Sequence, residues 1–159
     1  MGKKTFNGTS DAVVSALDFL PTFSELAGAD LPKKELDGQS ITPFLSTGEL
    51  ERNKPLIWSF YNALNDRVVA MRKGDYKIMA RLKNEEGYLP KILNVHSGNE
   101  GLVKNATLSD FVLYDLSQDI GETNELSTKR PEVFAAMKNE LTEEYRALLK
   151  DSPIWSRNP

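Results

Sequence analysis

The feature that most constrains the fold is an apolar segment that contains a proline, ALDFLPTFSELAG at residues 16–28. Proline inside a helix removes a hydrogen bond and clashes with the preceding turn, at a cost of about 3 kcal/mol. This cost is avoided if the helix begins just before Pro21, because N–H groups in a first turn have no intrahelical partner. Asp18 is then expected at the N-cap and Gly28 just past the C-terminus. The sequence therefore predicts a helix over about residues 16–27.

This predicted helix has one broad apolar side. The residues that form it recur at helical spacing: Phe19, Leu20, Phe23, Leu26 and Ala27. An amphipathic helix has to bury such a stripe. The helix therefore packs either on the rest of this chain or on a larger body outside it.

The remainder of the chain predicts short strands followed by a long helix. The expected strands lie at residues 55–61, 67–72, 76–82 and 111–116. Lys73-Gly-Asp75 predicts a hairpin turn between the second and third strands. Residues 83–109 are weakly patterned, and we expect an irregular excursion there with one short strand at 91–95.

The last element is a helix from Pro131 to Leu149, capped by Ser127 or Thr128. Its apolar residues recur at helical spacing, so they lie on one side of the helix. The order of elements predicts an α+β fold: a small, about four-stranded antiparallel sheet packed with a long C-terminal helix.

Composition excludes several classes of partner and site. The chain is 40% apolar and has a net charge of −3, which is typical of a soluble globular protein. Its 159 residues are enough for one domain, or for one domain and a fragment of another. Basic residues are scattered, so we expect no nucleic-acid partner. No apolar run approaches the roughly 20 residues of a membrane span, so we expect no membrane partner. The absence of cysteine excludes disulfides, thiolate metal sites and cysteine nucleophiles.

The residues by themselves predict no catalytic centre. His96 is the one histidine, and neither a glycine-rich phosphate loop nor a Gly-x-Ser-x-Gly motif is present. Four acidic residues lie close together but lack the EF-hand order, so we expect them to be turn carboxylates: Asp115, Asp119, Glu122 and Glu125. Three aromatic residues in the first predicted strand either join the core or stack on a sugar: Trp58, Phe60 and Tyr61.

Several short motifs, in a consistent order, resemble the region that follows the catalytic half of sulfatases. They are Ser15-x-x-Asp-x-Leu-Pro-Thr22, Glu25-Leu-Ala-Gly28, Leu36-Asp-Gly-x-Ser40, Pro43-x-Leu45, Arg52, Ile57-Trp58, Ala70-x-Arg-Lys-Gly-Asp-Tyr-Lys-Ile78, Leu113-Tyr-Asp-Leu116, Asp119, Glu122-x-Asn-x-Leu126 and Pro131-Glu132. The chain thus resembles the C-terminal part of an arylsulfatase-type enzyme of the alkaline phosphatase superfamily, except over residues 83–109.

The resemblance implies a parent enzyme that hydrolyses sulfuric esters, periplasmic or secreted. Family members use a formylglycine made from Cys or Ser in a Cys/Ser-x-Pro-x-Arg motif, and a calcium ion held by aspartates with Asn or Gln. This chain has no such motif, so we expect no catalytic residue and no metal site here. Calcium and formylglycine are expected in the parent catalytic domain.

The resemblance also implies a domain division and a partner. Residues 1–50 would continue from the catalytic domain, and residues 51–159 would form the C-terminal subdomain. In the family the helix that corresponds to residues 16–27 lies against the N-terminal catalytic domain, which makes that domain of the same parent chain the expected partner. Without it, the exposed stripe could drive self-association.

In the family the loop after the Ile-Trp strand lies near the substrate pocket. Here that loop is residues 59–66. Residues in it and next to it are expected to contact a sulfated small molecule or glycan: Trp58, Tyr61, Asn62 and Arg67. Tyr61 and Asn62 would contact a sugar, and Arg67 would meet an anionic substituent. Many relatives have a histidine in this loop and this chain does not, so His96 is a candidate replacement.

The leading hypothesis is therefore a sulfatase C-terminal subdomain that supports the fold and the substrate pocket and is not catalytic alone. The parent substrate would be a sulfated carbohydrate or an aryl sulfate. One alternative from another class is a free-standing carbohydrate-binding or interaction module. Another is the tail of a related phosphate or phosphonate ester hydrolase.

Overall fold

The structure is a computed structural model that describes residues 7–152. The chain forms two compact units, Met1–Leu56 and Ile57–Pro159. The sequence placed a domain boundary after residue 50, and the assignment of the two parts to two sulfatase domains stays a prediction. The ends of those predicted domains, 1–6 and 153–159, lie outside the described residues.

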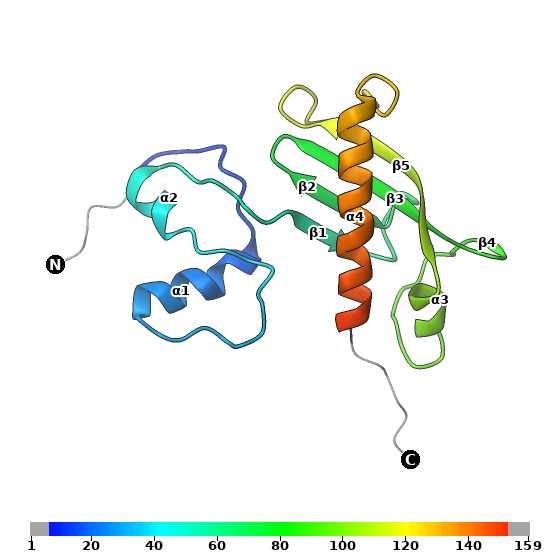
Figure 1. Ribbon diagram of the computed structural model, residues 1–159, viewed down its shortest axis with the longest axis horizontal. Coiled ribbons are helices and arrows are strands. Elements are labelled where there is room, and N and C mark those ends of the chain that lie inside the picture. The colour runs from blue at the N-terminus through cyan, green and yellow to red at the C-terminus, as the bar shows by residue number, and fades with distance from the viewer. Residues whose placement is uncertain (1–6, 153–159) are drawn as a thin grey trace, which may run out of the picture. The chain divides into compact units, whose positions relative to one another are not determined.

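The first unit contains the proline-bearing helix, and its start is as predicted. A short 3₁₀ turn, η1 (Ala16–Asp18), leads into α1 (Phe19–Ala27), and a second short helix, α2 (Thr42–Thr47), follows (Figure 1). Pro21 lies in the first turn of α1, and Gly28 ends the helix at a φ of 65° in the left-handed region. Glycine adopts this conformation without strain.

The capping of this helix differs from the prediction. Asp18 occupies the N-cap position of α1, but its side chain makes no capping bond to that helix. Its backbone is already helical, at φ −77° and ψ −14°. Its carboxylate points back toward Ser15 and is buried in the unit. Ser15 provides the cap one turn earlier: its hydroxyl accepts a bond from the Leu17 N–H at 3.3 Å, and its own N–H donates to Asp18 Oδ2 at 2.7 Å.

An antiparallel sheet organises the second unit and has one strand more than predicted. Its strands are β1 (Leu56–Ser59), β2 (Val69–Lys73), β3 (Tyr76–Asn84), β4 (Gly87–Tyr88) and β5 (Thr107–Asp115). The order is β1-β2-β3-β4, and β5 also pairs with β3. β3 is therefore the central strand, paired antiparallel with β2, β4 and β5.

The predicted hairpin between β2 and β3 is confirmed. Lys73 pairs with Tyr76 across a two-residue turn, and Gly74 has a φ of 57°. A positive φ at the first turn residue suits the right-handed twist of the flanking strands and favours glycine.

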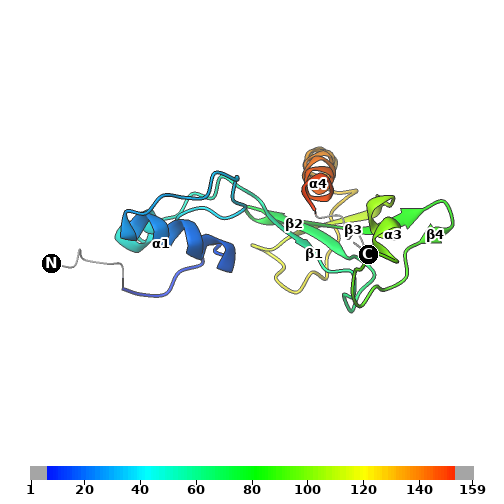
Figure 2. The same ribbon diagram turned by 90° about the horizontal axis from the view of Figure 1, so that it is seen from below.

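The core lies between one face of the sheet and α4 (Pro131–Asp151), which runs along that face (Figure 2). Three residues of α4 at four-residue spacing are buried: Met137, Leu141 and Tyr145. They pack with sheet residues that have no exposed surface, Val69, Met71, Ile78, Ala80 and Leu113. The predicted α+β architecture with a long C-terminal helix is confirmed.

The predicted cap of this long helix is wrong. The N-cap residue is Arg130, which makes no side-chain capping bond. A proline disfavours helical backbone angles in the residue before it. The helix therefore begins at Pro131 and not earlier. Ser127 instead donates its hydroxyl to Glu125 at 2.9 Å.

The excursion at 83–109 is more ordered than predicted. No strand forms at 91–95; the segment contains β4, a short helix α3 (Glu100–Lys104) and the beginning of β5. The apolar residues at 91–95 belong to a loop. Ile92 of this loop is buried, and its N–H donates to the Tyr61 carbonyl at 2.9 Å.

The alternation of buried and solvated residues that is typical of a half-buried strand does not hold at Met79 of β3. Met79 follows the buried Ile78 and would lie on the solvated face, but it is only 6% exposed. It pairs with Val112 of β5, which is likewise buried. The centre of the sheet face that carries Met79 is therefore covered. The alternation of residues along one strand does not predict this.

Shortening a fully buried side chain of α4 tests the core. We expect Leu141→Ala to lower the free energy of unfolding by about 2–5 kcal/mol, because it removes buried methyl groups and leaves a cavity. Urea unfolding measures the change. Leu148→Ala on the same helix is the control, since Leu148 is 38% exposed; an equal loss in both variants would contradict this placement of the core.

Two of the four acidic residues that were predicted to be turn carboxylates, Asp119 and Glu125, accept hydrogen bonds from backbone N–H groups of the turn after β5. Asp119 Oδ2 accepts bonds from the N–H groups of Thr123 and Asn124 at 2.8 and 2.7 Å. Glu125 Oε1 accepts from the N–H groups of Leu113 and Ser127 at 3.1 and 2.8 Å. Burial acts to raise the pKa of Glu125, but these bonds and the nearby charge of Arg67 outweigh it and hold the pKa below its usual value.

A depressed carboxyl pKa stabilises the fold at neutral pH, and this contribution disappears as the carboxylate is protonated. We expect wild-type stability to fall as the pH drops below the ordinary glutamate pKa of about 4.3, and Glu125→Gln to reduce that fall. Urea midpoints across this pH range measure it. Glu143→Gln, an exposed substitution on α4, should leave the pH profile unchanged; a profile identical in all three proteins would contradict the role of Glu125.

Candidate functional site

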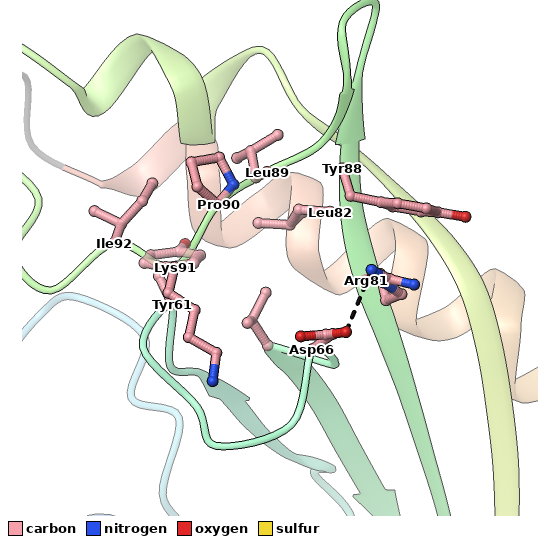
Figure 3. A pocket seen from close by; sticks show the side chains of 10 residues that line it. Tyr61, Asp66, Arg81, Leu82, Tyr88, Leu89, Pro90, Lys91 and Ile92 are labelled. Atoms are coloured by element: carbon pink, nitrogen blue, oxygen red, sulfur yellow. Dashed lines mark ion pairs between the residues drawn. The ribbon is translucent and has the colours of Figure 1, made fainter.

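The second unit contains a small pocket formed by three stretches of chain. It lies beside the end of β3 and is bounded by the loop after β1 and by the segment that follows β4 (Figure 3). Its volume is about 120 Å³. Its lining residues are Tyr61, Asp66, Val68, Arg81, Leu82, Tyr88, Leu89, Pro90, Lys91 and Ile92.

Arg81 is the central polar residue of this pocket. Its guanidinium carbon lies 3.7 Å from the centre of the Tyr88 ring, a stacking distance for a cation on an aromatic face. Its Nη2 lies 3.4 Å from Asp66 Oδ2. The Tyr88 hydroxyl is hydrogen-bonded to Asp110, which, with burial, raises the pKa of Tyr88.

The loop after β1 is tied to the rest of the unit at several points. The Tyr61 hydroxyl lies 3.4 Å from the Tyr145 hydroxyl on α4. Burial is the main cause that raises the pKa of Tyr145 far above its ordinary value, so this phenol stays protonated. Lys91 Nζ donates to the Leu64 carbonyl at 2.9 Å. These contacts hold both walls of the pocket in place.

The structure places the five predicted site residues in different surroundings. Tyr61 lines the pocket, Asn62 follows it and is half-buried, and Trp58 on β1 is 45% exposed. Arg67 lies next to the pocket-lining residues in sequence, but its Nε is buried without a hydrogen-bond partner. His96 is exposed, and its Nδ1 accepts a bond from the Gly98 N–H at 3.0 Å.

Sequence reasoning missed most of this pocket. The missed polar and aromatic residues are Asp66, Arg81, Tyr88 and Lys91. Arg81 carried a usable signal, because a polar residue between the apolar residues Ala80 and Leu82 of a strand is expected on the solvated face. Tyr88 and Lys91 lie in the weakly patterned excursion, where no periodicity indicated what they face.

In the first unit, the apolar side of α1 is exposed. Phe19, Leu20, Phe23 and Leu26 keep between 51% and 62% of their surface, and the Phe19 and Phe23 rings stack with centroids 5.9 Å apart. The opposite side of the helix contributes buried residues, Pro21 and Thr22. The helix thus presents its apolar stripe to the outside of the unit.

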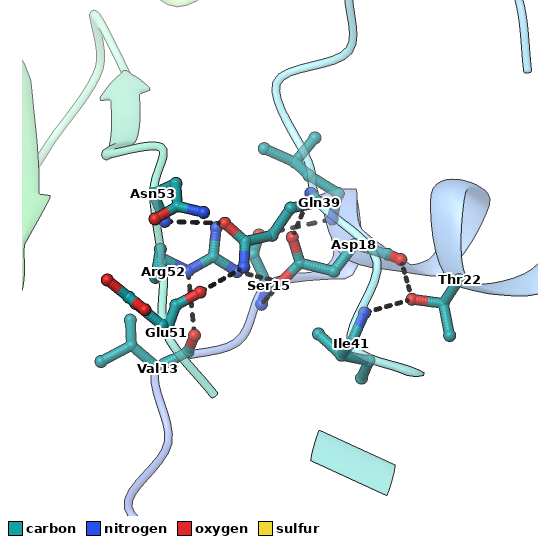
Figure 4. Close-up of polar contacts among 10 residues, drawn as sticks. Val13, Ser15, Asp18, Thr22, Gln39, Ile41, Glu51, Arg52 and Asn53 are labelled. Atoms are coloured by element: carbon teal, nitrogen blue, oxygen red, sulfur yellow. Dashed lines mark hydrogen bonds and ion pairs between the residues drawn. The ribbon is translucent and has the colours of Figure 1, made fainter. Parts of the chain in front are cut away.

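A buried ion pair organises the unit behind this helix (Figure 4). Asp18 has no exposed surface, and its Oδ2 accepts from both Arg52 and the Ser15 N–H. Its Oδ1 accepts from the Gln39 N–H at 3.0 Å. Arg52 Nε donates to the Val13 carbonyl at 2.9 Å. One carboxylate therefore joins three segments that are distant in sequence.

Further polar bonds extend this cluster, which we call the Asp18 hub and which comprises Val13, Ser15, Asp18, Thr22, Gln39, Ile41, Glu51, Arg52 and Asn53. The Thr22 hydroxyl donates to the Asp18 carbonyl and accepts from the Ile41 N–H at 3.0 Å. Gly38 packs against the hub so closely that an added Cβ would lie 2.0 Å from the Leu17 carbonyl oxygen.

The described residues do not fit a sulfatase metal or nucleophile. Between residues 7 and 152 no group of three or more His, Cys, Asp or Glu side chains could hold a metal ion. The chain contains no cysteine and no Ser-x-Pro-x-Arg. Within the same residues, no helix is both long enough and apolar enough to cross a membrane.

Comparison with known proteins identifies the family. No family model matches the chain. Arylsulfatase A of Bos taurus is 31% identical over 141 residues, which covers 79% of this chain and 24% of that protein. A sulfatase of Formosa agariphila is 30% identical over 167 residues, covering 91% of this chain and 25% of that protein.

A solved structure shares the fold of this chain. The crystal structure of Ps i-CgsB in complex with k-i-k-neocarrahexaose matches 91% of this chain with a TM-score of 0.56 and 22% identity, over 27% of its own length. The chain belongs to the sulfatases and matches their C-terminal region. It spans about a quarter of the length of the curated relatives it matches.

The Asp18 hub can be tested in this sulfatase region. Asp18→Asn leaves Arg52 buried without a counter-charge, and breaking a buried pair in this way costs about 3–5 kcal/mol. We expect faster hydrogen exchange at the Ser15 and Gln39 amides, which both donate to Asp18. Glu35→Gln is the control, because Glu35 is 87% exposed in its ion pair with Lys54. Unchanged exchange in Asp18→Asn would show that the hub does not hold the unit.

Proposed function

We propose that this chain is the non-catalytic C-terminal subdomain of a sulfuric ester hydrolase that acts on a sulfated carbohydrate or an aryl sulfate. The observation that carries the proposal is the similarity to sulfatases over most of this chain but only a quarter of theirs. The chain supports the fold and one side of the substrate pocket, and the N-terminal catalytic domain of the same parent chain supplies the reaction.

The exposed stripe of α1 supports docking onto that catalytic domain. Four large apolar side chains on one helix face, each more than half exposed, are unfavourable in water. The Asp18 hub fixes the opposite side of the helix, so the stripe is presented with its backbone already ordered. Ordering before association lowers the entropic cost of binding.

The chemistry is divided between the two parts. Formylglycine and calcium in the catalytic domain provide the nucleophile and the positive charge that sulfate transfer requires. This chain provides substrate contacts, for which Trp58, Tyr61, Asn62, Arg67 and His96 remain candidates. Two structural neighbours support a carbohydrate substrate, since one was solved with k-i-k-neocarrahexaose and another, BT4656, with its substrate D-glucosamine-2-N,6-O-disulfate.

The docking experiment combines this chain with the separately produced catalytic domain of the parent. We expect the chain alone to hydrolyse no aryl sulfate and to bind that domain through α1. Phe19→Ser combined with Phe23→Ser should weaken binding by at least about a hundredfold, because two large apolar side chains are no longer buried. Calorimetry measures affinity, and release of the aryl alcohol measures turnover.

Leu64→Ser is the matched control, because Leu64 is 98% exposed and lies outside the helix. It should leave the affinity unchanged. Sulfate release by the chain alone would overturn the non-catalytic role. Glycan binding without any affinity for the catalytic domain would favour a free-standing binding module instead.

A further inference from the structure

We propose that the pocket beside the end of β3 is a subsite for an anionic saccharide, in which Arg81 and Lys91 bind a sulfate or carboxylate substituent and Tyr61 and Tyr88 border the sugar ring. The proposal rests on the proposed function only for the source of the ligand. The binding chemistry depends on the pocket alone.

The charge of the pocket favours an anion. Its lining contains two cations, Arg81 and Lys91, and one acid, Asp66. Lys83 adds a third positive charge close by, with its Nζ 5.9 Å from the centre of the Tyr88 ring. Asp110, which is hydrogen-bonded to the Tyr88 hydroxyl, adds a second acid. Cations still outnumber acids, so a small anion that enters the pocket meets a net positive charge.

Arg81 retains donors for a ligand. It contacts Asp66 through one nitrogen at 3.4 Å, and the Asp66 side chain is 63% exposed. Exposed ion pairs contribute little to stability, so an incoming sulfate can replace this contact at low cost. The Tyr88 ring supports the guanidinium from one face, which leaves its in-plane N–H groups directed sideways, the geometry that binds sulfate or carboxylate in pairs.

Lys91 is positioned at the other wall. Its ammonium group has three donors, and the Leu64 carbonyl accepts one of them. This bond holds the ammonium group near the loop after β1, and Figure 3 shows Lys91 and Arg81 on different sides of the pocket. The anion can therefore be bound from two sides.

The remaining walls suit the carbon face of a sugar. They are apolar, formed by Val68, Leu82, Leu89, Pro90 and Ile92. Tyr61 and Tyr88 add aromatic rings with a polar tip, which combine apolar contact with hydrogen bonding. A volume of about 120 Å³ admits a charged substituent with the adjoining ring edge, so a longer glycan would extend outward over the exposed rim.

The pocket is ordered before ligand arrives. Tyr61 is fixed by the Tyr145 hydroxyl at 3.4 Å and by the bond from the Ile92 N–H to its carbonyl. Tyr88 is fixed by its pairing in β4 and by Asp110. The two aromatic side chains therefore lose little conformational freedom when a ligand binds, which lowers the entropic cost of the sugar contacts.

The test titrates the 159-residue chain with a sulfated disaccharide, a uronic-acid disaccharide, the desulfated neutral disaccharide and inorganic sulfate alone. Calorimetry gives affinities, and amide chemical shifts locate the binding. We expect both anionic disaccharides to bind at residues 61–68 and 81–92, and the neutral one to bind about tenfold more weakly or worse. Inorganic sulfate should bind more weakly than either anionic sugar, because it lacks the ring contacts.

Arg81→Gln should weaken binding of the sulfated disaccharide by about tenfold or more, and Arg81→Lys should restore part of the loss. Lys91→Gln is the second variant, placed on a loop and outside the sheet, so a folding defect of Arg81→Gln would not decide the outcome. Lys73→Gln removes the same charge at the far end of the β2–β3 hairpin, where Lys73 pairs with Glu140, and should change nothing.

Equal affinity for the neutral and sulfated disaccharides would overturn the anionic specificity. Shifts confined to other residues, or full affinity in both Arg81→Gln and Lys91→Gln, would overturn the site. Inorganic sulfate binding as tightly as the disaccharides would overturn the saccharide part. Failure of α1 to dock on a catalytic domain would leave these titrations unaffected, so the two proposals fail separately.

Discussion

The buried pair of Asp18 and Arg52 is the interaction on which the first unit depends. This unit turns its large apolar side chains outward and therefore has little apolar core of its own. Asp18 replaces that core with hydrogen bonds: it accepts from Ser15, Gln39 and Arg52, and Arg52 reaches on to Val13. A buried carboxylate with each oxygen bonded gives a defined geometry. The exposed face of α1 can exist because polar bonds hold the helix from behind.

The second unit is organised differently, around the central strand β3. Ile78, Ala80 and Leu82 of this strand are buried, whereas Arg81 lies at the pocket. One strand thus contributes to the core and to the candidate binding surface. Because β3 pairs with β2, β4 and β5, the position of Arg81 is set by the sheet. A binding residue on such a strand is held more firmly than one on a loop.

Much of the fold could be predicted because the information is local. Pro21 and Gly28 set the limits of α1, Gly74 sets the hairpin, and the apolar spacing after Pro131 sets α4. The failures also have local causes. The strand predicted at 91–95 is a loop, in which Ile92 bonds through its N–H to the Tyr61 carbonyl and not to a neighbouring strand. Residues 83–109 lacked periodicity, so the part of the pocket that they form, Tyr88 and Lys91, could not be predicted, and only Tyr61 among the five candidate site residues lines it.

The sequence by itself determined the elements, the α+β class and, through short ordered motifs, the resemblance to sulfatases. It also determined that the chain lacks a cysteine or Ser-x-Pro-x-Arg nucleophile. Tertiary structure alone decided which charges meet: Asp18 with Arg52, 34 residues apart, and Arg81 with Asp66 and Tyr88. Periodicity reports only which side of an element is apolar, because it reflects neighbours along one helix or strand. The partner across space depends on how the segments pack.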